Sequence, residues 1–305
     1  MKAAVYTSYG SPSVLKVTEI EKPIPKANEL LVKIHAATVT AGDIRLRASD
    51  FPPLFWLPAR LMFGLFKPKK KILGHEFAGV VEAVGEKVSK FTIGDEIFGT
   101  TTMLSTGSYA EYVCVPEAWK SGVVAKKPKN LSFEESAALP VGAMTALYLL
   151  KKAKMDRSKE VLIYGASGSV GSYAVQLAHH LGKSVTGVCS TSNIDMVKSL
   201  SADEVIDYKK QDYTTRSQDF DIVFDAVGKT SKTVAKKVLK KHGVFVSVNM
   251  LTSEKIEDLL EIKQTAEAEK LKPYIDKTYS LEQIVEAHKY VDSGRKRGNV
   301  VIKIK

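Results

Sequence analysis

The feature that most constrains the fold is a turn of small residues between an apolar run and an amphipathic segment, VLIYGASGSVG at residues 161–171. The run VLIY has the length and composition of a buried strand, and the following SYAVQLAHHLG has the apolar spacing of a helix. Gly168 has no Cβ, so backbone can approach a pyrophosphate there, and Gly171 allows the helix to pack on the strand. Because a helix start presents free N–H groups and a positive dipole end, this turn predicts a phosphate-binding loop.

The segment after the next strand indicates which dinucleotide is bound. The second strand, SVTGVC, is followed by Ser190, where an NAD-binding chain has Asp or Glu for the ribose 2′-hydroxyl. The run STSN at 190–193 offers hydroxyl and amide donors without negative charge, which suits a 2′-phosphate and predicts NADPH. Ser192 or Asn193 also suits the cap of the helix IDMVKSL, and the two roles are compatible.

The order of the predicted elements indicates two domains. Residues 126–250 alternate short apolar runs with amphipathic segments, which predicts a doubly wound parallel sheet. Residues 1 to 125 instead show short β-like runs separated by Gly, Pro and Asn, as in a small β-barrel or sandwich. From about residue 255, two helices precede a closing strand, GNVVIKIK. We therefore expect an α/β protein.

Composition narrows the classes of protein and partner. The 305 residues are 44% hydrophobic, enough for full cores, and no apolar run is long enough to span a bilayer. The N-terminal segment lacks the apolar core of a signal peptide, so we expect a cytoplasmic location without a membrane span. Cys114 and Cys189 lack C-x-x-C spacing, which excludes a disulfide framework. The net charge is +11, but KPKKK at 67–71 lacks interleaved aromatics, so nucleic acid is not favoured as a partner.

One apolar segment resembles a membrane element. FPPLFWLPARLMFGLF at 51–66 is too short to span a bilayer and contains three prolines and Arg60. A loop or short helix that covers a pocket is favoured over membrane contact. Such a lining predicts an apolar substrate.

Motifs along nearly the whole chain resemble those of the medium-chain dehydrogenase/reductase superfamily, and within it the zinc-independent quinone oxidoreductases. The motifs are MKAAVYTSYG, GHEFAGVVEAVGEKVSKFTIGDEIFG, GSYAEYVCVPE, AALPVGAMTAL, VLIYGASGSVGSYAVQLA, GVCSTSN, EVIDY, DIVFDAVG, KLKPYIDKTYSLEQIVEAH and RGNVVIKI. The resemblance implies a GroES-like β-barrel domain at 1–125, completed by 268–305. It also implies a Rossmann nucleotide-binding domain at 126–267, with nicotinamide and substrate meeting between the two.

The resemblance also bears on zinc. Zinc-dependent relatives place Cys in the segment matching TVTAGD, His in GHE, and Cys or Asp in the segment matching LPVG. Here Thr40 and His75 stand at the first two places, and Val141 or Gly142 at the third. A catalytic zinc needs three protein ligands, so no metal is expected. His75 and Glu76 then have structural roles, or His75 faces the pocket.

For the metal-free branch, the resemblance implies hydride transfer from NADPH to a small apolar acceptor, either a quinone or the β-carbon of an α,β-unsaturated ketone or aldehyde. The protein supplies orientation and a hydrogen bond to the developing enolate oxygen. Asp43 lies near the nicotinamide, or instead pairs with Arg45 or Arg47, and the proton comes from water or Thr40. The candidate catalytic residues are Thr40, Asp43 and His75. The candidate cofactor-binding residues are Thr145, Gly165, Ser167, Gly168, Ser169, Val170, Ser190, Ser192, Asn193, Tyr208, Val227, Val248 and Asn249.

One departure from the family concerns assembly. Relatives usually have a further strand, which commonly pairs two subunits, between VFVSVN and the helix before KLKP, whereas MLTSEKIEDLL connects these segments here. Either the chain has lost that dimer mode or a stretch is missing, so a homodimer stays open. The basic charge leaves two alternative functions, a nucleotide-bound scaffold or a nucleic-acid-binding protein without turnover. A zinc alcohol dehydrogenase with unfamiliar ligands is a third.

Overall fold

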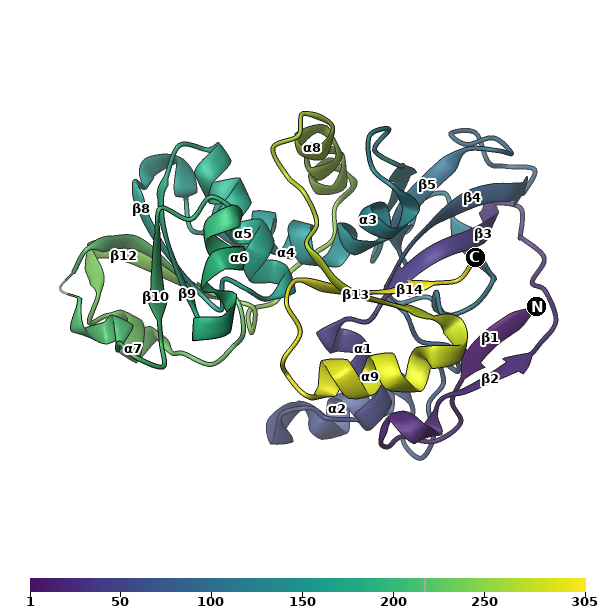
Figure 1. The fold of residues 1–305 in the computed structure, drawn as a ribbon. Helices are drawn as coiled ribbons and strands as arrows, with labels where there is room; N and C mark the ends of the chain where they lie inside the picture. The colour runs from purple at the N-terminus through teal and green to yellow at the C-terminus, as the bar shows by residue number, and fades with distance from the viewer. Residues whose placement is uncertain (217) are drawn as a thin grey trace. The chain divides into compact units, whose positions relative to one another are not determined.

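The computed structural model describes residues 1–216 and 218–305, which divide into two compact units (Figure 1). Unit 1 comprises Met1–Val141, Lys255–Leu260 and Ile275–Lys305, and unit 2 comprises Gly142–Glu254 and Glu261–Tyr274. Unit 1 extends beyond the expected boundary at residue 125, because helix α3 (Phe133–Ala138) packs on its strands β3, β4 and β14. The return of the chain to unit 1 for its last strands follows the implied arrangement.

Unit 1 is built on a seven-stranded sheet. Its order is β13 (Ile275–Ser280), β14 (Asn299–Lys303), β3 (Glu29–Thr38), β4 (Glu76–Val84), β5 (Glu96–Thr100) and β7 (Val124–Lys126), with β6 (Tyr112–Pro116) paired to β3. Two further strands, β1 (Lys2–Val5) and β2 (Lys16–Glu19), pair antiparallel. Along β3 the alternate residues Leu30, Val32 and Ile34 enter one core, as the two-residue period of a strand requires. The predicted GroES-like β domain is confirmed.

The helices of unit 1 flank this sheet. They are α1 (Ala41–Ala48), α2 (Pro53–Phe63), α3 and α9 (Ile284–Asp292), with 3₁₀ turns at Pro12–Val14 and Leu281–Gln283. The buried residues of α9 are Ile284, Ala287, His288 and Val291, the spacing of one helical face. By contrast α2, predicted as a loop or short helix, has no buried residue. Every helix of residues 1–216 and 218–305 is too short or too polar to traverse a bilayer.

Unit 2 contains the predicted parallel sheet. The strand order is β10 (Glu204–Asp207), β9 (Ser184–Cys189), β8 (Glu160–Tyr164), β11 (Phe220–Asp225) and β12 (Leu239–Ser247), and every pairing is parallel. Its helices are α5 (Ser169–His180), α6 (Ile194–Ser199) and α7 (Lys232–Ala235), with 3₁₀ turns at Met155–Arg157, Thr191–Asn193 and Tyr213–Thr215. Two helices, α4 (Pro140–Lys152) and α8 (Ile256–Glu267), begin in unit 1 and continue here. Val161, Leu162 and Ile163 are fully buried in β8, as expected of a strand covered on both faces.

The strand order places a reversal beside β8. The chain fills β8, β9 and β10 outward on one side, then returns to β11 on the other. In doubly wound sheets, ligands bind at the carboxyl ends of strands at such a reversal. The opposite edge is β12, and residues 248–255 connect it to α8 without a further strand. The predicted Rossmann fold is confirmed.

Candidate functional site

The phosphate turn, residues 165–171, has the tight geometry that its glycines predict. Gly165 has φ of +82°, and a Cβ there would lie 2.5 Å from Cγ1 of Val227. The N–H groups of Gly165 and Ala166 both donate to the Val188 carbonyl at 3.0 Å, which holds the turn to the end of β9. A Cβ on Gly171 would lie 2.2 Å from the Gly165 oxygen, so only glycine lets α5 pack this closely.

The start of α5 is open toward solvent and has no side-chain cap. Gly168 is its N-cap, and a Cβ there would meet nothing closer than the Gly165 oxygen at 3.5 Å. Ser169 and Val170 form the first turn, whose N–H groups have no acceptor inside the helix. The dipole adds positive potential at the same place. The turn can therefore receive an anionic group.

The segment after β9 contacts the phosphate turn. The Asn193 side-chain amide donates to Oγ of Ser167 at 2.9 Å, and the hydroxyls of Ser190 and Ser192 lie 3.3 Å apart. Asn193 occupies the N-cap of α6 but makes no capping hydrogen bond with its side chain. The Asn193 side chain thus contacts the phosphate turn and does not cap α6, while its contact with a 2′-phosphate stays a prediction.

Tyr208 lies beside the same end of the sheet. Its side chain is exposed, and its N–H donates to the Cys189 carbonyl at 3.1 Å. It borders a pocket of about 390 Å³ whose other lining residues are Tyr164, Lys209, Lys210, Gln211, Asp212 and Tyr213. The two lysines, which our sequence reasoning missed, bring positive charge next to the segment that ends β9.

Asp207 is a second residue that the sequence reasoning missed. Its carboxylate accepts a hydrogen bond from the Thr191 hydroxyl at 2.6 Å and one from the Lys209 N–H at 3.0 Å. The Thr191 hydrogen bond is the main cause that lowers the pKa of this carboxyl, with smaller contributions from Lys210 and Lys209. Its position at the end of the run EVID was the available signal, because polar residues that end parallel strands meet at the ligand edge.

The loops after β11 and β12 form the other side of this edge. The fully buried Asp225 carboxylate accepts hydrogen bonds from the N–H of Val227 at 3.2 Å and of Gly228 at 2.9 Å. Val248 donates its N–H to the Asp225 carbonyl at 3.0 Å, and the Asn249 amide reaches the Gly228 oxygen at 3.4 Å. The predicted residues Val227, Val248 and Asn249 thus lie together, positioned by a carboxylate that we had interpreted only as part of a strand.

Helix α4 also contacts the phosphate turn. A Cβ on Gly142 would lie 2.6 Å from Oγ of Ser169, so the start of this helix packs directly on the start of α5. Thr145 is half-buried one turn further along α4. Its place under the cofactor stays a prediction.

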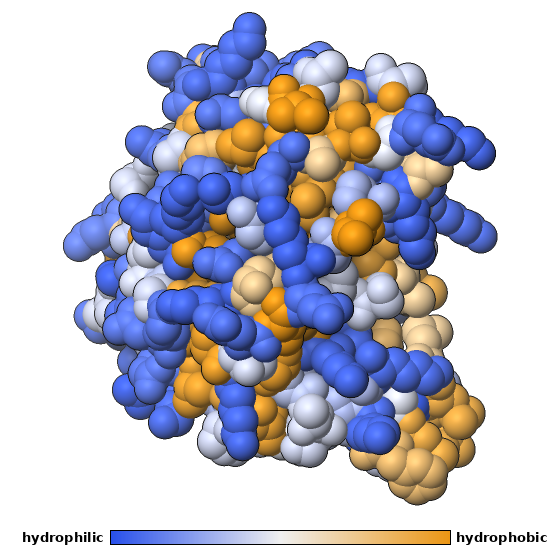
Figure 2. All heavy atoms as spheres, turned by 90° about the vertical axis from the view of Figure 1, so that its right-hand side faces the viewer, coloured by the Kyte–Doolittle hydropathy of each residue, from blue (hydrophilic) through white to orange (hydrophobic). Residues whose placement is uncertain are grey.

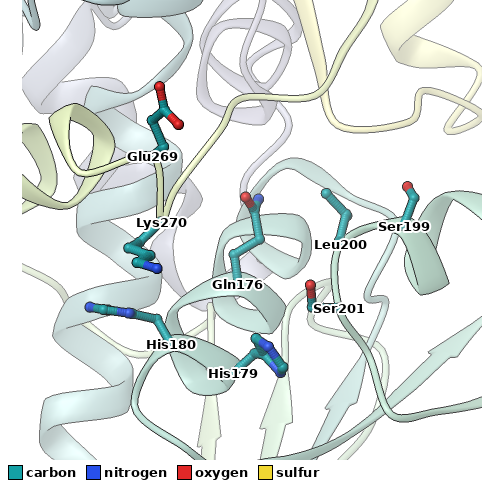
Figure 3. A pocket seen from close by; sticks show the side chains of 8 residues that line it. All are labelled: Gln176, His179, His180, Ser199, Leu200, Ser201, Glu269 and Lys270. Atoms are coloured by element: carbon teal, nitrogen blue, oxygen red, sulfur yellow. The ribbon is translucent and has the colours of Figure 1, made fainter.

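A polar pocket of about 470 Å³ lies at the other end of α5 (Figure 3). Gln176, His179 and His180 line it from α5, together with Ser199, Leu200, Ser201, Glu269 and Lys270. The Gln176 amide donates to the Lys272 carbonyl at 3.0 Å and accepts from the Lys272 N–H at 2.8 Å. Gln176 thus fastens the segment after α8 to α5, at the opposite end of the helix from the phosphate turn.

In unit 1 the three candidate catalytic residues lie together. Thr40 caps α1, and Asp43 in the first turn completes a capping box with it. One Asp43 oxygen accepts from the Thr40 N–H at 2.9 Å and the Thr40 hydroxyl at 2.6 Å. The other accepts from the Gly74 N–H at 2.9 Å and lies 2.8 Å from Nδ1 of His75. Arg47 instead pairs with Asp292 at 2.8 Å, so the alternative pairing of Asp43 with that arginine is wrong.

This pairing determines the state of the imidazole. Burial alone would raise the pKa of Asp43, but the charge and hydrogen bond of His75 and the hydrogen bonds of Thr40 hold it well below its usual range. The carboxylate is therefore an acceptor, and Nδ1 of His75 carries a proton. The His75 side chain is 20% exposed while that of Asp43 is fully buried. Nε2 is consequently the ring atom available to a substrate.

Glu76, next to His75, has a structural environment. It accepts hydrogen bonds from the Thr38 hydroxyl and from the Val141 N–H, the latter at 2.7 Å. Burial raises the pKa of its carboxyl to about 7 against the effect of these donors. Burial likewise lowers the pKa of Lys296 to about 8, opposed by the charge of Glu76. Glu76 thereby ties β4 to β3 and to the start of α4.

The residues at the zinc positions of relatives do not fit a catalytic zinc. The Thr40 hydroxyl is bound to Asp43, and Val141 offers no side-chain donor atom. Among the residues that the structure describes, no three His, Cys, Asp or Glu side chains converge closely enough to hold a metal ion. No step of the reaction is therefore assigned to a metal.

Comparison with known proteins identifies relatives of the whole chain. The alcohol dehydrogenase GroES-like domain matches residues 26–129, and the zinc-binding dehydrogenase family matches residues 200–302. The 2-methylene-furan-3-one reductase of Solanum lycopersicum is 35% identical, over 99% of this chain and 79% of its own length. The chloroplastic NADPH-dependent alkenal/one oxidoreductase of Arabidopsis thaliana is 30% identical over the same shares.

The solved structures agree with these relatives. The quinone oxidoreductase from Coxiella burnetii matches with a TM-score of 0.85 at 28% identity, over 100% of this chain and 99% of that one. The alignment covers both units. The chain is an NAD(P)H-dependent oxidoreductase and belongs to the medium-chain dehydrogenase/reductase superfamily, among its quinone and alkenal oxidoreductases.

Proposed function

We propose that this enzyme uses NADPH to reduce a quinone or an α,β-unsaturated ketone or aldehyde, without zinc. The observation that carries the cofactor assignment is the uncapped start of α5 at a turn hydrogen-bonded to Asn193, beside the uncharged Ser190. A diphosphate fits the start of α5, and a 2′-phosphate fits beside Ser190, with Lys209 and Lys210 nearby. NADPH supplies a hydride when bound there.

His75 is the best candidate to hold and donate the proton. Addition of a hydride to the β-carbon of an enone leaves an enolate, which needs one proton to give the saturated ketone. The Thr40 hydroxyl already donates its only proton to Asp43, so it cannot serve without breaking that bond. With both ring nitrogens protonated, His75 can donate from Nε2 to the enolate while Asp43 holds Nδ1, and water then restores the proton. For a quinone, transfer of the hydride gives the hydroquinone monoanion, and the same single proton yields the hydroquinone.

The substrate class is argued from relatives with the same fold. The relatives are named as enzymes that act on a methylene-furanone, an alkenal or enone, and a quinone. All three acceptors are apolar and place a carbonyl in conjugation with the carbon that receives the hydride. The common requirement is one hydrogen-bond donor at the carbonyl oxygen, which His75 provides.

Steady-state turnover tests the proposal. Purified enzyme is mixed with NADPH and a panel of quinones, alkenals and cyclic enones, and loss of NADPH absorbance is followed, with metal content measured on the same sample. We expect turnover with at least one class and no stoichiometric zinc. Absence of turnover across the panel, with NADPH still bound tightly, would indicate a nucleotide-binding scaffold instead. Stoichiometric zinc required for turnover would overturn the metal-free mechanism.

A further inference from the structure

Helix α2 and the loop after it expose an unusual amount of apolar surface. Leu54 is 83% exposed and Phe66 is 88% exposed, and the side chains between them are exposed almost continuously. We name as the α2 patch the residues Leu54, Phe55, Trp56, Leu57, Leu61, Met62, Leu65 and Phe66. In Figure 2, orange spheres gather at the lower edge of the molecule, the level at which α2 lies in Figure 1. Single exposed apolar residues are ordinary, but a contiguous group of this kind marks an interaction site.

The helix is held in this exposed position by contacts at its C-terminal end. The Tyr9 hydroxyl donates to the carbonyls of Phe63 at 3.0 Å and Gly64 at 2.9 Å. The Arg60 guanidinium lies over the Tyr9 ring, 4.1 Å from its centre, and Phe51 stacks on Phe63 with ring centres 6.0 Å apart. The patch is therefore presented by an anchored helix and not by a loose loop.

The charges within residues 51–75 have one sign, and one exposed carboxylate, Asp50, directly precedes them. Residues 51–75 contain Arg60, Lys67, Lys69, Lys70 and Lys71 and no Asp or Glu. Lys67, Lys69 and Lys71 are exposed, whereas the Lys70 ammonium turns inward to the Thr101 carbonyl at 3.3 Å. Three exposed cations thus follow directly on the apolar patch. A partner must combine an apolar phase with negative charge.

We propose that the α2 patch docks on an anionic lipid bilayer, with its apolar side chains at the level of the upper acyl chains and Lys67, Lys69 and Lys71 among the phosphates. A helix of 11 residues is about 16 Å long, too short to span a bilayer but suited to lie in its surface. Trp, Phe and Leu on a short helix with adjacent lysines are the composition of such surface-bound helices. This inference is independent of the proposed catalytic reaction.

Other occupants fit the charges less well. A second copy of the chain on this patch would bring two sets of lysines together without a carboxylate from residues 51–75 to neutralise them. A nucleic acid would neutralise the lysines but leave the Leu, Met and Phe side chains in water. A lipid surface satisfies both properties at once.

Vesicle sedimentation tests the charge requirement on the full-length protein. We expect binding to vesicles of phosphatidylcholine mixed with phosphatidylglycerol, weaker binding to phosphatidylcholine alone, and loss of binding as salt rises. Each cation near an anionic surface contributes about fivefold to partitioning, so the double variant K67Q/K71Q should bind roughly twenty-five-fold more weakly. The matched control K232Q/K236Q changes two exposed lysines of unit 2 and should bind as the parent does.

Trp56 reports contact without altering the patch. The chain has two tryptophans, and the indole of the other, Trp119, donates to the Thr102 carbonyl at 3.0 Å. In the W119F variant, the emission of Trp56 should shift to shorter wavelength with anionic vesicles and be quenched by brominated acyl chains. The variant L54S/F55S/F66S should lose sedimentation, whereas I24S/L251S, at two equally exposed apolar sites, should not.

Four results would overturn the proposal. They are absence of binding to anionic vesicles, an unchanged Trp56 emission despite binding, equal binding by the α2 and control variants, and a parent dimer that L54S/F55S/F66S converts to a monomer. The last result would assign the patch to a second copy. Binding to DNA or RNA that persists in L54S/F55S/F66S, combined with no vesicle binding, would assign the lysines to nucleic acid.

Discussion

Nδ1 of His75 lies 2.8 Å from Oδ1 of Asp43, and the other oxygen of the same carboxylate holds the Thr40 hydroxyl at 2.6 Å. In zinc-dependent relatives, the equivalents of Thr40 and His75 are metal ligands. Here both are bound to a buried carboxylate, which leaves Nε2 as the reactive atom of the group. In the proposed mechanism, this arrangement positions His75 as an acid.

Asp43→Asn should reduce turnover strongly. The Asp43 carboxylate has two acceptor oxygens for donors on Thr40, Gly74 and His75, whereas the asparagine amide has only one. The His75 ring therefore loses its fixed tautomer. We expect kcat to fall by about a hundredfold or more, with Kd for NADPH unchanged because the phosphate turn lies in unit 2. Asp276→Asn, at another carboxylate that binds Tyr290 and Arg297, is the control. A kcat that stays within about twofold of the parent would remove Asp43 from the mechanism.

His75→Ala tests the proton donor directly. Loss of the imidazole should lower kcat by about a hundredfold, and added imidazole should restore part of it. Rescue by a free base of matching chemistry distinguishes proton transfer from a structural role of the side chain. Glu76→Gln is the neighbouring control and should not respond to imidazole. Equal activity of His75→Ala and parent would return the role to water.

Substitutions at two glycines of the phosphate turn should have different effects. A Cβ at Gly168 makes only ordinary contacts, the nearest with the Gly165 oxygen at 3.5 Å, so in Gly168→Val the fold should persist while affinity for NADPH falls. Gly171→Ala puts a Cβ 2.2 Å from the Gly165 oxygen, so thermal stability itself should fall, by several degrees or more. Fluorescence titration with NADPH and a melting curve separate the two effects. Tight NADPH binding by Gly168→Val would contradict the assigned phosphate position.

Ser190→Asp should change cofactor preference. A carboxylate at the end of β9 repels a 2′-phosphate and accepts hydrogen bonds from a ribose 2′-hydroxyl, so kcat/KM for NADPH should fall by about tenfold or more relative to NADH. Ser201→Asp, which adds the same charge on the far side of α6, is the control. An unchanged NADPH/NADH ratio would place the 2′-phosphate elsewhere.

Glu76 should make stability depend on pH. Burial raises the pKa of its carboxyl from 4.5 to about 7, so between these values the folded protein keeps a proton that the unfolded chain releases. The contribution of Glu76 to the free energy of unfolding should therefore decrease by about 3 kcal/mol as pH rises from 4.5 to 7. His288, whose pKa burial lowers to about 4, contributes with the opposite sign. The pH dependence of urea unfolding should therefore differ between the parent and Glu76→Gln, whereas Glu257→Gln, at an exposed site, should match the parent. An unchanged pH dependence in Glu76→Gln would assign it to other groups.

The sequence predicted the elements whose causes are local. The strand, turn and helix around residues 161–180 follow from apolar periodicity and from glycines whose positions the structure explains. The extent of unit 1 was not predictable in this way, because α3 has small buried residues, Ser136, Ala137 and Ala138, that fit either unit until their packing on β3 and β4 is known. The exposure of α2 was also not predictable from the sequence, because its apolar composition suggests burial.

The pairs that build the site were harder to predict because they depend on tertiary contact. Asp43 and Arg47 are one helical turn apart, which suggested an ion pair, yet the buried partner of Asp43 is His75 and that of Arg47 is Asp292. Asn193 was interpreted as a donor to a 2′-phosphate or as a helix cap, and the hydrogen bond from its amide to Ser167 was not predicted. In both cases the hydrogen-bond or ion-pair partner in the structure is a residue distant in sequence and not a neighbour along the helix.

Asp43 both completes the capping box of α1 with Thr40 and orients the His75 ring, so the start of α1 and the position of the ring depend on the same carboxylate. Substitutions at residue 40 or 43 are thus expected to lower thermal stability and turnover together, and a larger loss of one should accompany a larger loss of the other. Redesign of this enzyme for new acceptors is better directed at residues that surround the His75 ring than at Thr40 and Asp43, which orient it.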